Sequence, residues 1–475
     1  MSTVIHPVVA APSRARTTLF AASFGFLMVS LDATIVNVAL PTLGRRLGAG
    51  LTGLQWVVDG YTLMFAAFQL IGGSLSDRLG ARRAFATGLS LFVLASLACG
   101  LAGTPGVLIA ARFVQGLGAA VQLPASLAMI RHAYPDASAR SRALGVWAAA
   151  GGAAVAAGPV LGGLLLASLG WRSLFLVNLL IGGVGLLMTW RADATPAARG
   201  RPLDLPGQAA VVLALCGLTF GFIEAGRLGW ASPPVAAALA TAVACGVFFV
   251  WWERRVSEPL LPMRLFARPV FSAASVAGFA QNFAYYGIVF LLSLFLQNER
   301  GDSALATGLI FLPMSIAAMG SNMLGGRLTA RLGPRVPMIG GQLLFAAGLL
   351  TLLVAGTGAS NPVIWLATVP VGIGAGAVVP AMTSAVLETV EPGHAGVASA
   401  ELNTARQVGG AVGVALFGGL VAGDLGHGLR LSLAIAAAAL LLSAAAAARW
   451  VRSAAPGRAR RPATAPEPAR PGPPR

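Results

Sequence analysis

The sequence predicts an all-α membrane protein that crosses the bilayer many times. Of its 475 residues, 56% are hydrophobic and only 10% are charged, whereas a soluble domain carries about 25% charged residues. Apolar runs recur along the chain, each long enough to cross a hydrocarbon core about 30 Å thick as a helix of about 20 residues. Sixty glycines favour close packing of these helices, because small residues let membrane helices approach one another.

Fourteen apolar runs are predicted to form transmembrane helices, arranged as six, two and six. The first six make an N-terminal half at 18–190, the next two an insert at 207–252, and the last six a C-terminal half at 270–449. The loops between the runs are too short to hold a soluble catalytic or nucleotide-binding domain. The predicted spans are 18–40, 54–75, 84–103, 106–130, 142–167, 172–190, 207–226, 234–252, 270–297, 304–326, 336–355, 362–384, 396–423 and 428–449.

The arginines predict the orientation in the membrane. With an even number of spans both ends lie on one side, and basic residues gather on the cytoplasmic side. Segments on the side of the two ends hold 25 of the 33 arginines, and the opposite loops hold six. We therefore expect 1–17 to be a cytoplasmic N-terminal tail and 450–475 a disordered basic cytoplasmic tail. The charge of the second tail is expected to anchor the topology in solvent, with contact to anionic lipid as the alternative.

The chain contains no lysine, which excludes several mechanisms. A Walker A loop needs a lysine to reach the phosphates of ATP, and Schiff-base cofactors need a lysine amine. We therefore expect no nucleotide and no cofactor. The net charge of +17 lies mostly on one side of the membrane, which argues against nucleic-acid binding. The bias toward arginine, alanine, glycine and proline is that of a GC-rich genome and indicates a bacterial inner membrane.

Metal, disulfide and enzyme chemistry are not indicated by the sequence. The cysteines lie in apolar runs without motif spacing, and the histidines lie at helix ends or in loops. An intramembrane enzyme would need a clustered nucleophile or metal site, so we expect no enzyme activity and no metal. The residues considered are Cys99, Cys216, Cys245, His6, His132, His394 and His427.

Two stretches of sequence repeat at nearly the same offset. Residues 72–83 (GGSLSDRLGARR) and 325–336 (GGRLTARLGPRV) match at seven of twelve positions, and GLGAAVQLPA from Gly116 resembles GIGAGAVVPA from Gly372. A shared offset indicates two homologous halves. Parallel repeats of this kind are a transporter design, with the substrate site between the halves near the membrane midplane.

Six of the charged residues inside the predicted spans call for an explanation. A charge near the bilayer centre costs about 2.5–3.5 kcal/mol on insertion scales, so each needs an explanation. At a rise of 1.5 Å per residue, Asp32, Asp59 and Arg112 lie at one depth, roughly 8–13 Å below the outer surface, and we expect them to form one charge cluster. Glu401 is expected to snorkel or to pair structurally, and Glu224 to be interfacial. The set is Asp32, Asp59, Arg112, Glu224, Glu401 and Arg406.

The expected cluster has a functional and a structural interpretation. A carboxylate in a low dielectric can titrate, and a nearby arginine opposes its protonation, so Asp32 and Arg112 are candidates for proton coupling. Gln115 belongs to a polar stripe on the helix of Arg112, and such a stripe must face protein or water. The alternatives are that Arg112 only locks helices together and that Asp59 is a wet, outward-facing acid.

Five motifs follow one another along nearly the whole chain. They are LDATIVNVALP at 31–41, GGSLSDRLGARR at 72–83, ARFVQGLGAA at 111–120, GPVLGG at 158–163 and WRSLFLVN at 171–178. Together they resemble the major facilitator superfamily and, within it, the fourteen-span drug:proton antiporters. The resemblance implies a major facilitator fold, a proton-transfer role for Arg112 and a proton gradient as the energy source.

The resemblance gives the second motif, in the loop between spans 2 and 3, the role of a conformational latch. Gly73 is expected to permit close helix contact. Asp77, at an inner helix end, is expected to meet the positive N-terminus of a helix from the other half and to hold an outward-open state. Arg78 and Arg82 would pair around it, and Gly80 completes the motif.

The fourth motif resembles the span-5 motif of antiporters. Gly158, Pro159, Gly162 and Gly163 remove bulk and a backbone donor, which predicts a kinked, tightly packed helix at the interface between the halves. Plain helix packing is the alternative interpretation of these glycines.

We therefore expect a monomeric secondary antiporter that admits protons and exports small amphipathic or hydrophobic compounds by alternating access. Its partners would be the transported molecule, protons and membrane lipid. The alternatives are a dedicated exporter or importer of one metabolite or natural product, and a membrane receptor that binds without transporting.

Overall fold

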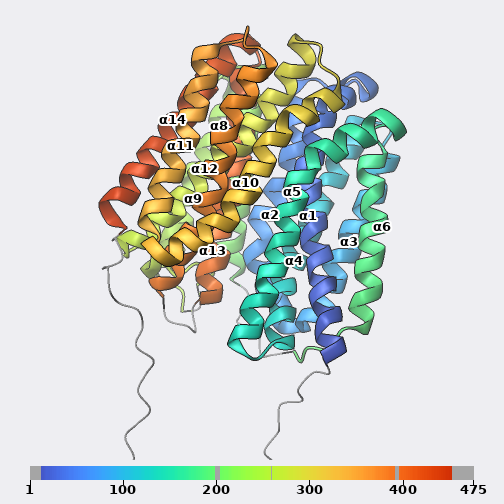
Figure 1. Cartoon of the computed structure of the whole chain (residues 1–475), viewed down its shortest axis with the longest axis vertical. Helices are drawn as coiled ribbons and strands as arrows, with labels where there is room; N and C mark the ends of the chain where they lie inside the picture. Colours follow the sequence, from blue (N-terminus) through green and yellow to red (C-terminus); the bar gives the residue numbers. More distant parts are fainter. Residues whose placement is uncertain (1–11, 198–203, 258, 391–394, 452–475) are drawn as a thin grey trace, which may run out of the picture.

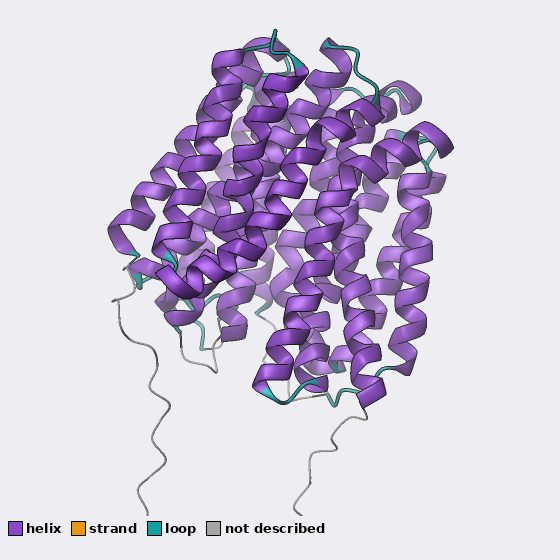
Figure 2. Ribbon diagram, in the orientation of Figure 1, coloured by secondary structure: helices purple, strands orange, loops and turns teal. Residues whose placement is uncertain are grey.

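The computed structural model describes residues 12–197, 204–257, 259–390 and 395–451, and these are almost entirely helical (Figure 2). Fourteen α-helices within them run back and forth through one bundle (Figure 1), with a 3₁₀ turn at Met263–Leu265 and a π-helical turn at Phe295–Glu299. The helices are α1 Pro12–Leu47, α2 Leu51–Leu79, α3 Ala81–Leu101, α4 Pro105–Ala133, α5 Ala137–Leu169, α6 Ser173–Arg191, α7 Leu205–Leu228, α8 Pro233–Glu253, α9 Pro269–Leu294, α10 Ala304–Leu332, α11 Arg335–Ala355, α12 Asn361–Glu388, α13 Ala395–Leu420 and α14 Leu425–Trp450.

Thirteen of the helices in the described part of the chain are long and apolar enough to cross a membrane. The exception is α13, which carries both Glu401 and Arg406. The predicted all-helical membrane fold is confirmed, and most helices extend beyond the predicted spans. The tails expected at the two ends fall largely on 1–11 and 452–475, which lie outside the described residues, and α1 already begins at Pro12.

Close helix contacts recur at the two repeated stretches. In α4, a Cβ on Gly116 would overlap the carbonyl oxygen of Tyr61 in α2, and in α12 a Cβ on Gly372 would overlap that of Met314 in α10. Further matched contacts are Gly118 with Gly88, Gly374 with Gly341, Gly72 with Ala120, and Gly325 with Ala377. The repeated sequences therefore fold into repeated contacts of α4 with α2 and α3, and of α12 with α10 and α11.

The helices α7 and α8 pack against each other. α7 also contacts α2, one of the first six helices, and α13, one of the last six. Gln208 of α7 donates to the carbonyl oxygen of Ala67 in α2 at 2.7 Å. Toward the other end of α7, a Cβ on Gly226 would lie 3.0 Å from the carbonyl oxygen of Gly419 in α13. α8 buries few of its side chains, so most of its apolar surface is left for lipid.

The first six helices and the last six meet toward the end of the bundle that lies opposite the start of α1 (Figure 1). Ser293 of α9 donates to the carbonyl oxygen of Asn37 in α1 at 2.7 Å. Gln55, one turn into α2, donates to the carbonyl oxygen of Ala415 in α13 at 2.9 Å. Buried hydrogen bonds of this kind tie the two groups of helices together at that end.

Candidate functional site

The buried acid Asp32 lies at the centre of a polar network that joins α1, α3, α4 and α6. Its carboxylate is fully buried and forms an ion pair with Arg112 of α4 through Oδ2. Its other oxygen, Oδ1, accepts hydrogen bonds from Gln115 Nε2 and Asn178 Nδ2, each at 2.9 Å. The same two amide groups donate to Ser96 Oγ at 2.8 and 3.4 Å. One cation and two amides therefore surround the negative charge.

The guanidinium group of Arg112 is held by α2 as well as by Asp32. Its Nη1 also donates to Gln115 Oε1 at 2.6 Å, and its Nε donates to the carbonyl oxygen of Val57 at 2.8 Å. Its Cζ lies 4.4 Å from the ring centroid of Tyr61, a cation–π geometry. A buried ion pair is tolerated when its remaining donors and acceptors are bonded. Arg112 Nε and Asp32 Oδ1 have such partners, whereas Asn178 Oδ1 is buried without one among the described residues.

Small residues next to Gln115 let the helices approach closely enough to form the network. A Cβ on Gly118 would lie 2.8 Å from the carbonyl oxygen of Gly88 in α3, and Gly116 lies against α2. Arg112 and Gln115 are three residues apart and so share one face of α4. The glycine-rich sequence of α4 thus lets the carbonyl group of Val57 in α2 and the hydroxyl group of Ser96 in α3 reach the same face of α4.

Asp59 does not join this network, so the prediction of one three-charge cluster is wrong for this residue. It is fully buried, and neither carboxylate oxygen has a hydrogen-bond partner among the described residues. It lies one turn after Gln55, which bonds to α13, and helical spacing places it on the same face of α2. Depth along a helix does not define rotation about its axis, so a predicted common depth could not show which acid joins the network.

The other charges in the spans have separate surroundings. Glu401 of α13 is buried, and its carboxylate has no partner within the described segments, so it neither snorkels nor pairs as expected. The aliphatic stem of Arg406 packs on α9, where a Cβ on Gly278 would lie 2.8 Å from Cγ. Glu224 is buried near the end of α7 and pairs with Arg227 at 2.8 Å.

The loop motif packs on the segment that follows α6. Arg82 donates through Nη1 to the carbonyl oxygen of Ala192 at 2.9 Å, and its backbone N–H donates to Thr195 Oγ1 at 2.8 Å. Gly80 has a φ of +82°, and a Cβ there would overlap the carbonyl oxygen of Thr195. Asp77 is exposed. Arg82 therefore binds backbone after α6 and does not pair around Asp77 as expected.

The close contact expected at Gly73 is made by its neighbour. A Cβ on Gly72 would overlap the carbonyl oxygen of Ala120 in α4, whereas nothing lies within 4 Å of a Cβ on Gly73. Arg78 is exposed at the end of α2. The tight helix contact in this motif thus comes one residue earlier than predicted.

The helix α5 lies between α1 and α10, and its glycines contact both. Gly158 and Gly162 face α1, where a Cβ on Gly162 would lie 3.0 Å from the carbonyl oxygen of Ile35. Gly163 faces α10, with a would-be Cβ 2.8 Å from the carbonyl oxygen of Ala304. The tight packing predicted for this motif is therefore present, and it joins the helix of Asp32 to the C-terminal helices.

A match to a family model covers most of the chain. The model of the Major Facilitator Superfamily matches residues 22–414. The chain belongs to the major facilitator superfamily. Members of this superfamily are transporters rather than enzymes, and the chain shares their fold. The xylose transporter XylE from E. coli, solved in an inward-open conformation, superposes with a TM-score of 0.65 at 15% identity, covering 94% of this chain and 98% of XylE.

Bacterial members of the superfamily are similar over most of their length. The chain is 40% identical over 436 residues to a protein of Streptomyces coelicolor named methylenomycin A resistance protein, covering 90% of this chain and 91% of that one. It is 38% identical over 406 residues to the multidrug resistance protein Stp of Mycobacterium tuberculosis, covering 85% of this chain and 75% of Stp. This facilitator is thus a multi-pass membrane protein with bacterial relatives.

Two members of the Asp32 network were not among the residues singled out from the sequence of this facilitator. Asn178 ends the motif WRSLFLVN, and its place in that motif was the available signal. Ser96 lies in an ordinary apolar stretch of α3, and its sequence context carries no signal for a role. A single serine in a membrane helix commonly bonds to its own backbone, as Ser96 Oγ also does to Phe92 at 2.8 Å.

Proposed function

We propose that this protein is a proton-coupled antiporter of the fourteen-span drug:proton family that exports small amphipathic or hydrophobic compounds from a bacterial cell. Relatives at 33–40% identity bear names of resistance or export proteins for methylenomycin A, tetracenomycin C and puromycin, and of a multidrug resistance protein. The observation that carries the proton coupling is the fully buried ion pair of Asp32 and Arg112.

The proposed architecture is six plus two plus six helices. Residues 18–190 and 270–449 form two pseudo-symmetric halves, and 207–252 form the insert, supported by the recurring glycine contacts and by α7 packing on both halves. Both termini are cytoplasmic in the inner membrane, which the arginine distribution supports. The transporter works as a monomer, without cofactor or nucleotide, and draws on the proton gradient.

In this mechanism, protonation of Asp32 releases Arg112. A neutral carboxyl group no longer compensates the charge of the Arg112 guanidinium. The guanidinium is then stabilised by its hydrogen bonds to Gln115 and to the carbonyl oxygen of Val57. The energetic change is local to α1, α2 and α4. Because α1 packs on α5 and α5 on α10, a changed position of α1 is passed to the contact between the halves. A proton can shift a conformational equilibrium only through such a difference between two states.

The second acid and the loop motif take further parts in the proposal. Asp59, buried without a partner among the described residues, serves as a second proton site or as the group that meets a cationic compound. Asp77 docks on the N-terminus of a helix of the other half in the outward-open state. Its exposed position here then belongs to the opposite state, in which the halves meet at the end away from the start of α1.

The proton gradient is sufficient for this exchange. One charge moving inward releases about 2.3 kcal/mol per 100 mV, and a tenfold concentration ratio needs about 1.4 kcal/mol. One proton per exported molecule therefore sustains a ratio of about 50-fold at 100 mV.

Everted membrane vesicles with an interior pH dye test the proposal. Adding a transported compound should release protons from the interior of energised vesicles that contain the wild type. Vesicles that contain an equal amount of Asp32→Asn should show no such release. Glu388→Gln, which changes an acid at the exposed end of α12, is the matched control and should behave as wild type. Full proton-linked efflux by Asp32→Asn, or efflux that persists after the gradient is collapsed, would overturn the coupling.

A dedicated exporter of one natural product is the second candidate, since several relatives are named for resistance to a single antibiotic. A panel of chemically diverse compounds in the same vesicles separates the two. Proton release with many unlike compounds favours the multidrug exporter, and release with one compound class favours the dedicated one.

A further inference from the structure

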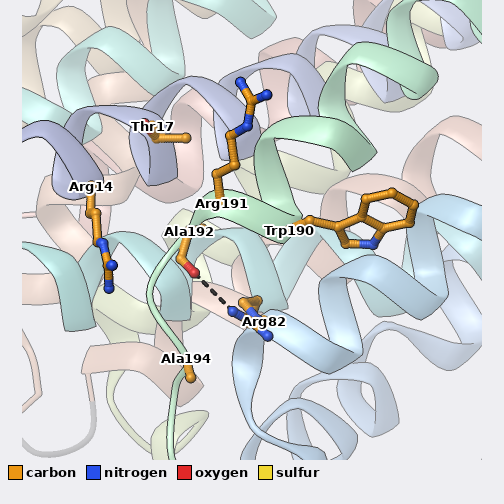
Figure 3. A pocket seen from close by; sticks show the side chains of 7 residues that line it. All are labelled: Arg14, Thr17, Arg82, Trp190, Arg191, Ala192 and Ala194. Carbon is orange, nitrogen blue, oxygen red and sulfur yellow. Dashed lines mark hydrogen bonds between the residues drawn. The ribbon is translucent and has the colours of Figure 1, made fainter.

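An arginine-lined recess lies at the end of the bundle where α1 and α3 begin and α6 ends (Figure 3). It encloses about 510 Å³. The residues that line it are Arg14, Thr17, Arg82, Trp190, Arg191, Ala192 and Ala194. The recess shares no residue with the Asp32 network, so the proton chemistry of Asp32 does not account for it.

Three arginines from three different helices line the recess, around the segment that follows α6, with the guanidinium group of Arg191 directed to the opposite side from those of Arg14 and Arg82 (Figure 3). The side chain of Arg14 is 67% exposed, and its partner is Asp193 at 3.6 Å. Arg191 is exposed, without an ion pair or hydrogen bond to the described part of the chain. Arg82 donates through Nη1 to the carbonyl oxygen of Ala192. The other N–H groups of its guanidinium are left for a ligand. The recess therefore has positive charge in excess of its one neighbouring carboxylate.

A tryptophan marks the membrane level of this recess. Trp190, in the last turn of α6, is 72% exposed, and its ring extends away from the arginines (Figure 3). Exposed tryptophans of membrane helices sit at the headgroup level. With Trp190 in that layer, the recess that it lines together with Arg14 and Arg191 lies at the level of the lipid headgroups.

We propose that this recess binds the phosphate group of an anionic phospholipid of the cytoplasmic leaflet. The proposal rests on the cytoplasmic orientation of the chain ends given above. Guanidinium groups bind phosphate oxygens through paired N–H donors, and basic pockets between membrane helices on the cytoplasmic side suit anionic headgroups. A free phosphate ion offers the same oxygens but gains nothing from the apolar surface beside Trp190, so the lipid is the occupant that uses the whole recess.

A lipid in this place would tether three parts of the N-terminal half. Arg82 belongs to the loop motif, Arg14 to the start of α1 and Arg191 to the end of α6. Because Gly80 and Arg82 also pack on Thr195, the bound headgroup would hold the loop motif in the arrangement seen here.

Native mass spectrometry of the full-length protein in detergent, titrated with dioleoyl phosphatidylglycerol, tests the site. Removing two arginines in Arg14→Ala/Arg191→Ala should weaken binding about 25-fold, at about fivefold for each charge near an anionic surface. Arg264→Ala/Arg268→Ala removes two exposed arginines between α8 and α9 and should leave the affinity unchanged. Equal losses in both double variants would overturn the site, because net charge alone would then explain binding.

Two further measurements keep the test independent of folding and of transport. Asp193→Asn removes the carboxylate beside Arg14 and should tighten binding severalfold, whereas unchanged or weaker binding counts against the site. Inorganic phosphate in large excess should not displace the lipid, and displacement would show an ion site rather than a lipid site. Since neither measurement uses transport, failure here leaves the antiporter proposal standing, and failure of transport leaves this one standing.

Discussion

Gly308 of α10 lies directly against Pro159 of α5, where a Cβ would overlap the carbonyl oxygen of Pro159. α5 remains one continuous helix from Ala137 to Leu169 through this proline. One turn after Pro159, Gly163 meets Ala304 in the same way. One helix from each half of the chain thus touches the other backbone to backbone, and any movement between the halves must slide or open this contact.

Gly308→Leu should impair both stability and efflux. A leucine has no room against the Pro159 backbone, and overpacking of this kind costs about 1–3 kcal/mol. The side chain would force α5 and α10 apart and block the closed contact that alternating access needs. Thermal unfolding in detergent and initial efflux rates in vesicles measure the two effects. Gly320→Leu in the same helix is the control, because nothing lies within 4 Å of a Cβ there. Equal behaviour of the two variants would contradict the role of the contact.

Arg112→Ala should destabilise the protein by about 3–5 kcal/mol, because it leaves the buried charge of Asp32 without its cation. The double variant Asp32→Asn/Arg112→Gln replaces both charges by amides that can bond to each other, and it should recover much of that stability. Thermal unfolding measures both. The double variant should still lack proton-coupled efflux. If it transports as the wild type does, the ion pair is a structural lock alone.

The membrane fold and the Asp32–Arg112 pair could be predicted from the sequence for physical reasons. Long apolar runs allow only helices in a bilayer, and a charge in such a run must find a partner. The rise per residue of a helix predicted one depth for both residues. The rotation of each helix is set by side-chain packing, so the place of Asp59 could not be predicted. For the same reason, neighbouring glycines could not be told apart, and Gly72 rather than Gly73 makes the close contact.

Those two adjacent glycines give a matched pair of variants. Gly72→Ala should lower the free energy of unfolding by about 1–3 kcal/mol, since its methyl group would overlap the carbonyl oxygen of Ala120. Gly73→Ala has open space and should be neutral or stabilising by up to about 1 kcal/mol, the helix-propensity difference between alanine and glycine. Urea or thermal unfolding of the purified proteins ranks them. The opposite order would mean that α2 is rotated relative to α4.

Asp59→Asn should differ in sign from Asp32→Asn in its effect on stability. Asp59 has no bonded partner to lose within the described part of the chain, so an amide removes an uncompensated buried acid and should leave the melting temperature unchanged or higher. Asp32→Asn leaves the charge of the Arg112 guanidinium uncompensated and should lower the melting temperature. In energised vesicles at 100 mV, loss of one of two coupled protons would lower the maximal concentration ratio by about 50-fold. Flux of protons and of compound, measured together, gives that stoichiometry. If the melting temperature falls equally in both variants, Asp59 has a stabilising partner in the membrane. The functional distinction drawn here between Asp32 and Asp59 would then be wrong.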